Sequence, residues 1–324
     1  MGRWAWRLVI LALLLAFCSL LGLGSLTREF RRPGPAGQTI TLVVSAGSGG
    51  RAIAAALSEA GVLRAPWAFL AAAAWRGLAG KLQAGEYRFA VAVSPREVLA
   101  MLVAGQTLVR RLTVPEGLTV QAIVALLAEA DGLVGDVPVL PAEGTLMPDT
   151  YGYSRGESRV AILRRMSEAM HHALGELWSN RQEGLPFSEP REALILASIV
   201  EKETASAAER ATVAGVYVNR LRRGMRLQAD PTVAYALTGG RMPLQRTLSR
   251  GDLEHPSPYN TYLVTGLPPG PIANPGREAI AAALRPAAVR YLYFVADGEG
   301  GHAFAETYVE HQRNVERWRR RNRD

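Results

Sequence analysis

The sequence predicts an α+β protein with three parts: an N-terminal transmembrane helix, a small α/β module, and a larger mixed α/β domain built around a buried helix that ends in glutamates. Three observations predict this arrangement. Residues 8–26 carry no charge, strand and helix signals recur three times between residues 39 and 130, and residues 193–200 are apolar apart from one serine. The 324 residues, 48% of them hydrophobic, suffice for two or three domains with their own cores.

The uncharged run of residues 8–26 nearly crosses a hydrocarbon core of about 30 Å when it is helical. Arg3 and Arg7 before it favour a cytoplasmic N-terminus, but three arginines follow within residues 28–32, so the charge rule is not decisive. Two glycines before Ser25 could also mark the cleavage site of a signal peptide. We expect an uncleaved anchor at residues 1–30, with the rest of the chain exported in either case.

The charge and the cysteine content limit the partners. The net charge of +8 and a pI near 10 favour an anionic polymer or a membrane surface. Nucleic acid is not expected, because an exported domain rarely meets it and no recognition motif occurs. Cys18 is the only cysteine and the five histidines lack metal-ligand spacing, so no disulfide, metal or other cofactor is expected.

After a linker at residues 31–38, strand and helix signals alternate. They are, in order, a strand at 39–44 and a helix at 52–60, a helix at 68–74, a strand at 86–93 with a helix from Ser94 and Pro95 to about Gly105, and a strand at 109–114 with a helix at 120–130. These units predict small α/β modules. We place the module at residues 39–110 and the larger domain at residues 111–324.

The larger domain contains two helices that meet near residue 201, followed by rigid loops. Before these two helices, a helix is predicted at residues 160–178. The second of the two is predicted to begin at a capping box formed by Ser206 and Glu209 and to end at Gly224. Residues 227–237 and 257–276 are rich in proline, glycine, asparagine and tyrosine, which is typical of the rigid walls of a cleft. Residues 290–296 predict a strand that enters a hairpin.

The buried helix supplies the candidate acid. Ser188 can cap it, and Pro190 suits its first turn. At helical spacing, Glu201 continues the stripe of Leu194 and Ala197 along a core-facing edge, whereas Glu203 points elsewhere. The negative end of the helix dipole and apolar walls should both raise the pKa of Glu201, as a general acid requires. The alternative is a solvated last turn with no chemical role.

Several long segments resemble the endolytic murein transglycosylases of the MltG, or YceG-like, family. They are ASIVEKET (197–204), VYVNRLRRGMRLQADPTVAYAL (216–237), PYNTYLVTGLPPGPIANPG (258–276) and YLYFVADGEGGHAF (291–304), with LQAGEYRF (82–89) and MPDTY (147–151) upstream. The resemblance covers about residues 40–315. Ala305 and Gln312 depart from it, because the family more often has Ser and Asn there.

The resemblance implies a single-pass protein of the inner membrane with its catalytic domain in the periplasm. The module at 39–110 would be LysM-like, and residues 111–324 would form the YceG-like catalytic domain. The family cleaves the β-1,4 bond between N-acetylmuramic acid and N-acetylglucosamine within glycan strands, leaves 1,6-anhydromuramoyl ends and thereby terminates nascent strands. The substrate would be peptidoglycan glycan strands, and peptidoglycan synthases would be the protein partners, although no residue identifies one.

The resemblance also places the catalytic glutamate at Glu201. Such an enzyme uses the C6 hydroxyl of the sugar as nucleophile, so one carboxylate can act first as acid and then as base. Asp230 could be a second carboxylate, or it could only form the turn before a helix. The residues expected to bind substrate are Asn219, Gln228, Asp230, Tyr259, Asn260 and Tyr262.

Two other functions remain open from the residues alone. A muramidase-type hydrolase would use water and would need Asp230 or Glu203 opposite Glu201. A non-catalytic glycan-binding scaffold of cell-wall synthesis would also explain the anchor and the basic charge, and in that protein replacing Glu201 by Gln would change nothing measurable.

Overall fold

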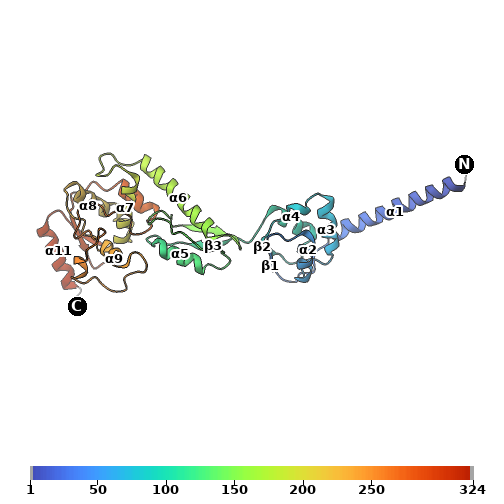
Figure 1. Ribbon diagram of the computed structural model, residues 1–324, viewed down its shortest axis with the longest axis horizontal. Coiled ribbons are helices and arrows are strands. Elements are labelled where there is room, and N and C mark those ends of the chain that lie inside the picture. Colours follow the sequence, from blue (N-terminus) through green and yellow to red (C-terminus); the bar gives the residue numbers. More distant parts are fainter. Residues whose placement is uncertain (1–2, 322–324) are drawn as a thin grey trace. The chain divides into compact units, whose positions relative to one another are not determined.

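The computed structural model describes residues 3–321, which form mixed α/β structure in two compact units (Figure 1). Unit 1 comprises Met1–Arg110 and Tyr153–Gly156, and unit 2 comprises Arg111–Gly152 and Glu157–Asp324. The predicted mixture of helices and strands and the predicted N-terminal apolar helix are both confirmed. Each unit has its own hydrophobic core.

Helix α1 (Arg3–Arg31) opens unit 1, and its segment Trp6–Arg31 is long and apolar enough to cross a membrane. The last residues of the helix pack against the module that follows it. The Phe30 side chain is buried in the module core, and the Arg76 guanidinium lies 4.6 Å from the centre of its ring. The following residues are also packed, because a Cβ on Gly34 would lie 2.4 Å from the Val93 carbonyl oxygen. The end of α1 is therefore part of the module.

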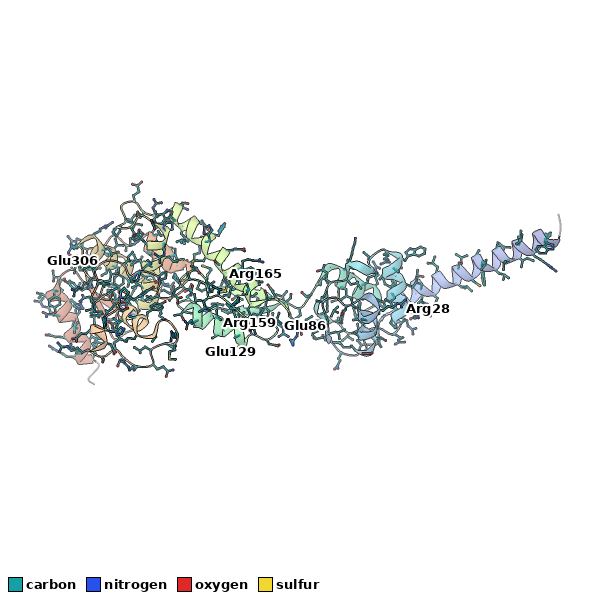
Figure 2. All side chains as sticks on the ribbon, viewed as in Figure 1. Arg28, Glu86, Glu129, Arg159, Arg165 and Glu306 are labelled. Carbon is teal, nitrogen blue, oxygen red and sulfur yellow. The ribbon has the colours of Figure 1, made fainter. Side chains whose placement is uncertain are left out.

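The module pairs strands β1 (Ile40–Val44) and β2 (Gly85–Phe89) antiparallel and covers them with helices. These helices are α2 (Gly50–Glu59), α3 (Pro66–Trp75), the 3-10 turn η1 (Ala79–Lys81) and α4 (Pro95–Ala104). Helix α4 begins as predicted, with Ser94 and Glu97 in a capping box, and ends at Gly105 with a φ of 63°. In Figure 2, Glu86 marks strand β2, where its carboxylate accepts two hydrogen bonds from Arg110.

Unit 2 contains most of the helices and two small sheets. Strands β3 (Arg110–Thr113) and β4 (Thr150–Tyr153) pair, as do β5 (Tyr293–Ala296) and β6 (His302–Ala305). The helices are α5 (Val120–Glu129), α6 (Arg159–Ser179), α7 (Pro190–Glu203), α8 (Arg210–Arg222), α9 (Asp230–Thr238), the 3-10 turn η2 (Asp252–Glu254), α10 (Arg277–Leu284) and α11 (Tyr308–Arg321).

Helix α7 forms the centre of unit 2. Every residue from 193 to 200 is buried, and α6, α8, α9 and α10 all contact the helix. Such enclosure requires an apolar surface on all sides, which the sequence supplies. Helix α6, marked by Arg159 and Arg165 in Figure 2, is tied to the end of α5 because Arg159 donates to the Leu127 and Ala128 carbonyls. Helix α7 is thus enclosed by four neighbouring helices.

Two local predictions are wrong. The residue that caps α7 is Glu189 rather than Ser188. No Ser206 and Glu209 capping box forms, because the Glu209 carboxylate instead accepts hydrogen bonds from the backbone N–H and the Nδ1 of His302. The strands of the three predicted strand and helix units lie in two sheets, since β1 pairs with β2 whereas β3 pairs with β4.

Candidate active site

A cleft of about 680 Å³ lies within unit 2, at the C-terminal end of α7. Its volume is within the range of ligand sites in proteins. The walls come from the start of α5, the end of α7, helix α9 and the segment of residues 240–248. The lining of these first three walls includes Lys202, Glu203 and Asp230. The last turn of the buried helix therefore does lead to a cleft, as its sequence pattern predicts.

Glu203 is the carboxylate of α7 that lines this cleft. The Tyr217 hydroxyl of α8 donates to its Oε1 at 2.6 Å, and no other hydrogen bond reaches this carboxylate from residues 3–321. Burial raises the pKa of Glu203 to about 7, with a further increase from the negative charge of Asp230. A carboxyl group with this pKa is about half protonated at neutral pH, so it can donate a proton and later accept one.

Asp230 lies in the same cleft, at the first residue of α9. The Tyr262 hydroxyl donates to its Oδ1 at 2.6 Å, and this carboxylate together with burial raises the pKa of Tyr262. The two predicted residues Asp230 and Tyr262 are thus brought together. Two carboxylates, Glu203 and Asp230, face one cavity, and each is held by one tyrosine hydroxyl.

Glu201 lies on the same turn of α7 but is not among the residues that line the cleft. Its side chain is only 6% exposed, its Oε2 accepts the Gly276 backbone N–H at 2.9 Å, and its Oε1 is 3.7 Å from an Arg210 nitrogen. Burial raises the pKa of Glu201, and the nearby Glu116 charge raises it further. The predicted direction of the pKa shift therefore holds, but the carboxylate faces a loop and the first turn of α8.

The amides among the predicted substrate residues hold backbone segments. Asn219 donates to the Val289 and Tyr291 carbonyls, and Asn260, fully buried, donates to the Leu253 and His255 carbonyls. The amide oxygen of Gln228 accepts from the buried Arg220, and its backbone has a φ of 52° in the left-handed region. The Tyr259 ring packs 5.0 Å from that of Tyr235.

Sequence reasoning did not identify Tyr217, Lys202 or Tyr235 as parts of the site. Tyr217 holds Glu203, while Lys202 donates from Nζ to the Gly117 carbonyl at 3.3 Å. Tyr235 lines the cleft and hydrogen bonds to Glu143, whose pKa burial raises. Tyr217 occupies an apolar stripe of α8, so its pattern predicts only core packing. Within the part of the chain that the structure describes, no group of three or more His, Cys, Asp or Glu side chains is arranged for a metal ion.

Comparison with known proteins gives a consistent family. Residues 42–317 match the YceG-like family. A protein of Bacillus subtilis strain 168 named endolytic murein transglycosylase is 30% identical over 311 residues, covering 86% of this chain and 85% of that protein. A protein of the same name from Streptococcus pneumoniae strain D39 is 28% identical over 323 residues. This match covers 85% of the present chain but only 58% of the longer pneumococcal protein.

The fold has a relative among solved structures. A YceG-like protein of Listeria monocytogenes, known from its crystal structure, superposes with a TM-score of 0.53 at 30% sequence identity. The superposition covers 85% of this chain and 99% of the Listeria chain.

Proposed function

The chain belongs to the YceG-like family, and from this membership we propose that it is an endolytic murein transglycosylase that cleaves the glycan strands of peptidoglycan. The observation that carries the proposal is the cleft of unit 2, in which Glu203 has a pKa of about 7. A single carboxyl group that can both give and take a proton at neutral pH is what this reaction requires. The bond cleaved is the β-1,4 bond between N-acetylmuramic acid and N-acetylglucosamine.

The chemical step needs no metal or second carboxylate. Protonated Glu203 donates its proton to the glycosidic oxygen while the bond from that oxygen to C1 of the muramoyl sugar breaks. The C6 hydroxyl of the same sugar attacks C1 and gives its proton to the Glu203 carboxylate, which restores the acid. The product carries a 1,6-anhydromuramoyl end, and no water is consumed. Since nucleophile and electrophile belong to one sugar ring, the attack gains the advantage of proximity.

The neighbours of Glu203 support its assignment as the acid. Tyr217 fixes one oxygen of the carboxyl group, and no hydrogen bond from the described residues holds the other. Asp230 lines the same cleft, so its carboxylate can oppose the positive charge that develops at C1 as the glycosidic bond breaks. Tyr262 holds Asp230 in place.

Glu201, the acid expected from the sequence, is the competing assignment. It also has a raised pKa, but it is not among the residues that line the cleft, and its carboxylate accepts a backbone hydrogen bond from Gly276. We therefore assign Glu203 as the acid and Glu201 as a residue that holds the end of α7 to the loop before α10.

Hydrolysis is the second candidate reaction, because Asp230 and Glu203 line the same cleft. In a muramidase-type hydrolase, Asp230 would hold the attacking water or form a covalent bond to the sugar. Transglycosylation is favoured by the names of the relatives and by the self-sufficient acid at Glu203. The two reactions differ in their products, because transglycosylation leaves a 1,6-anhydromuramoyl end and hydrolysis leaves a reducing end.

We also propose the location and the companions of the enzyme. Helix α1 would anchor it in the inner membrane, with both units in the periplasm and the module of unit 1 acting as a LysM-like domain. Peptidoglycan synthases would supply the nascent strands that it cuts. These statements are supported by the apolar character of α1 and by the substrate that the relatives' names give.

The experiment that tests the function uses the full chain in detergent with uncrosslinked glycan strands and mass spectrometry of the new ends. The expected ends are lighter by one water than a reducing sugar and are absent with Glu203→Gln. Ordinary reducing ends would establish hydrolysis instead and direct attention to Asp230→Asn. If the wild-type protein binds the strands but leaves them uncut, the protein is a glycan-binding scaffold.

A further inference from the structure

Helix α3 of the module is apolar on every side but buries only one of them. Its sequence, PWAFLAAAAW, contains no charged residue. The side formed by Ala68, Phe69, Ala72 and Ala73 is buried in the module core. On the other side, Trp67 is 50% exposed and Trp75 is 81% exposed. A helix without a polar face is normally enclosed, so the exposed side requires a covering surface.

The exposed residues share one face. Counted from Trp67, the partly or fully exposed positions are 70, 71, 74 and 75, which follow the helical spacing i, i+3, i+4, i+7 and i+8. We name these five residues, Trp67, Leu70, Ala71, Ala74 and Trp75, the outer face of α3. Two tryptophans at the ends of a strip of small and aliphatic residues form a flat apolar surface.

This face is close to the end of α1. The Arg76 guanidinium, next to Trp75, stacks on the Phe30 ring, and Arg64, just before α3, lines a small cavity together with Glu29 of α1. Both ends of α3 therefore approach the last turn of α1, and Figure 1 shows α3 at the end of the module from which α1 leaves. The contacts lie within unit 1.

The spacing along α1 places this contact at the depth of the lipid headgroups. The uncharged run ends at residue 26, and Phe30 follows four residues later, which is about 6 Å along a helix at 1.5 Å per residue. The interfacial region extends roughly 5–7 Å beyond the hydrocarbon core on each side. If α1 spans the bilayer, Phe30 and the Arg76 that stacks on it lie within the interfacial region.

We propose that the outer face of α3 lies in the headgroup region of the membrane that α1 spans, with Trp67 and Trp75 as interfacial anchors. Tryptophan is enriched at this depth because its ring is apolar and its indole N–H can hydrogen bond to water or headgroups. The inference rests on the membrane location proposed above and extends it from the anchor helix to the module.

The charges around the face fit lipid rather than a glycan strand or a second copy of the chain. Exposed arginines flank it: Arg28 (labelled in Figure 2), Arg31 and Arg32 at the end of α1, and Arg64 and Arg76 at the ends of α3. Arginines near an anionic lipid surface favour binding to it. Arginines around tryptophans, next to a helix long enough to span a membrane, are the pattern of an interfacial contact.

The test uses the full chain, reconstituted in vesicles of phosphatidylethanolamine and phosphatidylglycerol. Three proteins each retain one tryptophan, Trp6, Trp75 or Trp178, and carry phenylalanine at the other five positions. Lipids brominated near the headgroup end of their chains quench only indole rings that touch them. Trp6, in α1, reports on insertion of the anchor, and Trp178, stacked under Arg181 in unit 2, reports on a ring that the proposal does not place at lipid.

The expected result is loss of fluorescence and a blue shift for Trp75 and loss of fluorescence for Trp6, with no change for Trp178. A quenched Trp6 with an unquenched, red-emitting Trp75 would overturn the proposal and leave the anchor intact. If neither Trp6 nor Trp75 is quenched, α1 does not span the membrane and both ideas fail. If Trp75 responds to added glycan strands or to protein concentration but not to brominated lipid, a glycan or a second copy covers the face.

The same vesicles separate this inference from the proposed reaction. Cleavage of glycan strands by the Trp75 protein is measured in the presence and absence of brominated lipid. The reaction takes place in unit 2, so a protein that cuts strands with an unquenched Trp75 contradicts only the membrane contact. A protein with a quenched Trp75 that never cuts strands contradicts only the proposed activity.

Discussion

The two sides of the last turn of α7 present the same chemical group in different surroundings. On the cleft side, Glu203 lines the cavity, is itself buried, and is held by one tyrosine hydroxyl. On the loop side, Glu201 is enclosed by the Gly276 backbone and the Arg210 guanidinium. Burial raises the pKa of both carboxyl groups. A raised pKa therefore does not identify a catalytic acid by itself, because the acid must also lie within hydrogen-bond reach of the substrate.

The largest expected difference between the two sides is in rate. We expect Glu203→Gln to lower strand cleavage about 10²- to 10⁴-fold, the usual contribution of a general acid. Glu201→Gln should keep the rate within about tenfold, since an amide oxygen can still accept the Gly276 hydrogen bond. The measurement is the rate of new glycan ends at pH 6. An inactive Glu201→Gln protein that is folded, beside an active Glu203→Gln protein, would return the acid to Glu201.

The second expected difference is in stability against pH. Ionising Glu203 is harder in the folded protein, where its pKa is about 7, than in the unfolded chain, where the model value is 4.5. Wild-type stability should therefore fall as pH rises from about 4.5 to 7, and Glu203→Gln should avoid this loss. We expect the variant to be about 1–3 kcal/mol more stable at pH 8 and nearly equal at pH 4. Thermal unfolding at both pH values measures this, and an unchanged difference between them would show that the carboxyl group is not buried.

A third prediction concerns the hydrogen bond that ties α7 to the loop before α10. The fully buried Ser198 hydroxyl donates to the Ile195 carbonyl and accepts the Ile272 backbone N–H at 3.0 Å. Ser198→Ala leaves that N–H without its partner, at a cost of about 1–3 kcal/mol. The matched control is Ser179→Ala on α6, whose exposed hydroxyl bonds only to the Gly175 carbonyl and should change stability by less than about 0.5 kcal/mol. Equal effects of the two changes would argue against a role of Ser198 in holding the loop before α10 to α7.

The smallest expected effect tests the groups around Glu203. Asp230 raises the pKa of Glu203 and the Tyr217 hydrogen bond lowers it. Activity needs the protonated acid, so it should decline as pH rises through about 7. Asp230→Asn should move this decline to lower pH and Tyr217→Phe should move it to higher pH, each by roughly half to one unit. Shifts in the same direction, measured on kcat/KM from pH 5 to 9, would contradict the assignment of Glu203.

Much of the fold follows from local patterns. Helix α4 begins at Ser94 and Pro95 because the hydroxyl and the fixed proline φ both act within one turn. The enclosure of α7 follows from its unbroken apolar surface. The pairing of the strands could not be predicted in this way, since β1 and β2 are separated by two helices and no residue in either strand specifies its partner.

The site was harder to predict because its parts come from distant segments. Helical periodicity places Glu201 toward the protein interior, and the structure agrees that its side chain is enclosed. Periodicity cannot tell which side of the turn opens to a cleft, because residues 117–122, α9 and residues 240–248 form that cleft. The capping prediction was wrong for the same reason. Glu209 binds His302, which lies 93 residues further along the chain, and no local pattern indicates this contact.

The bonds that position α8 have a consequence for the order in which the protein assembles. Tyr217 holds the acid, but its helix is fixed by the Val289 carbonyl on Asn219 and the Leu292 carbonyl on Arg220, 70 and 72 residues further along the chain. At 5–20 residues per second, synthesis reaches these partners roughly 5 to 20 s after residue 203 is made. An incomplete chain can thus form the module but not the finished cleft. The side chain of Glu203, the proposed acid, is therefore held in its final position only when nearly the whole protein has been made.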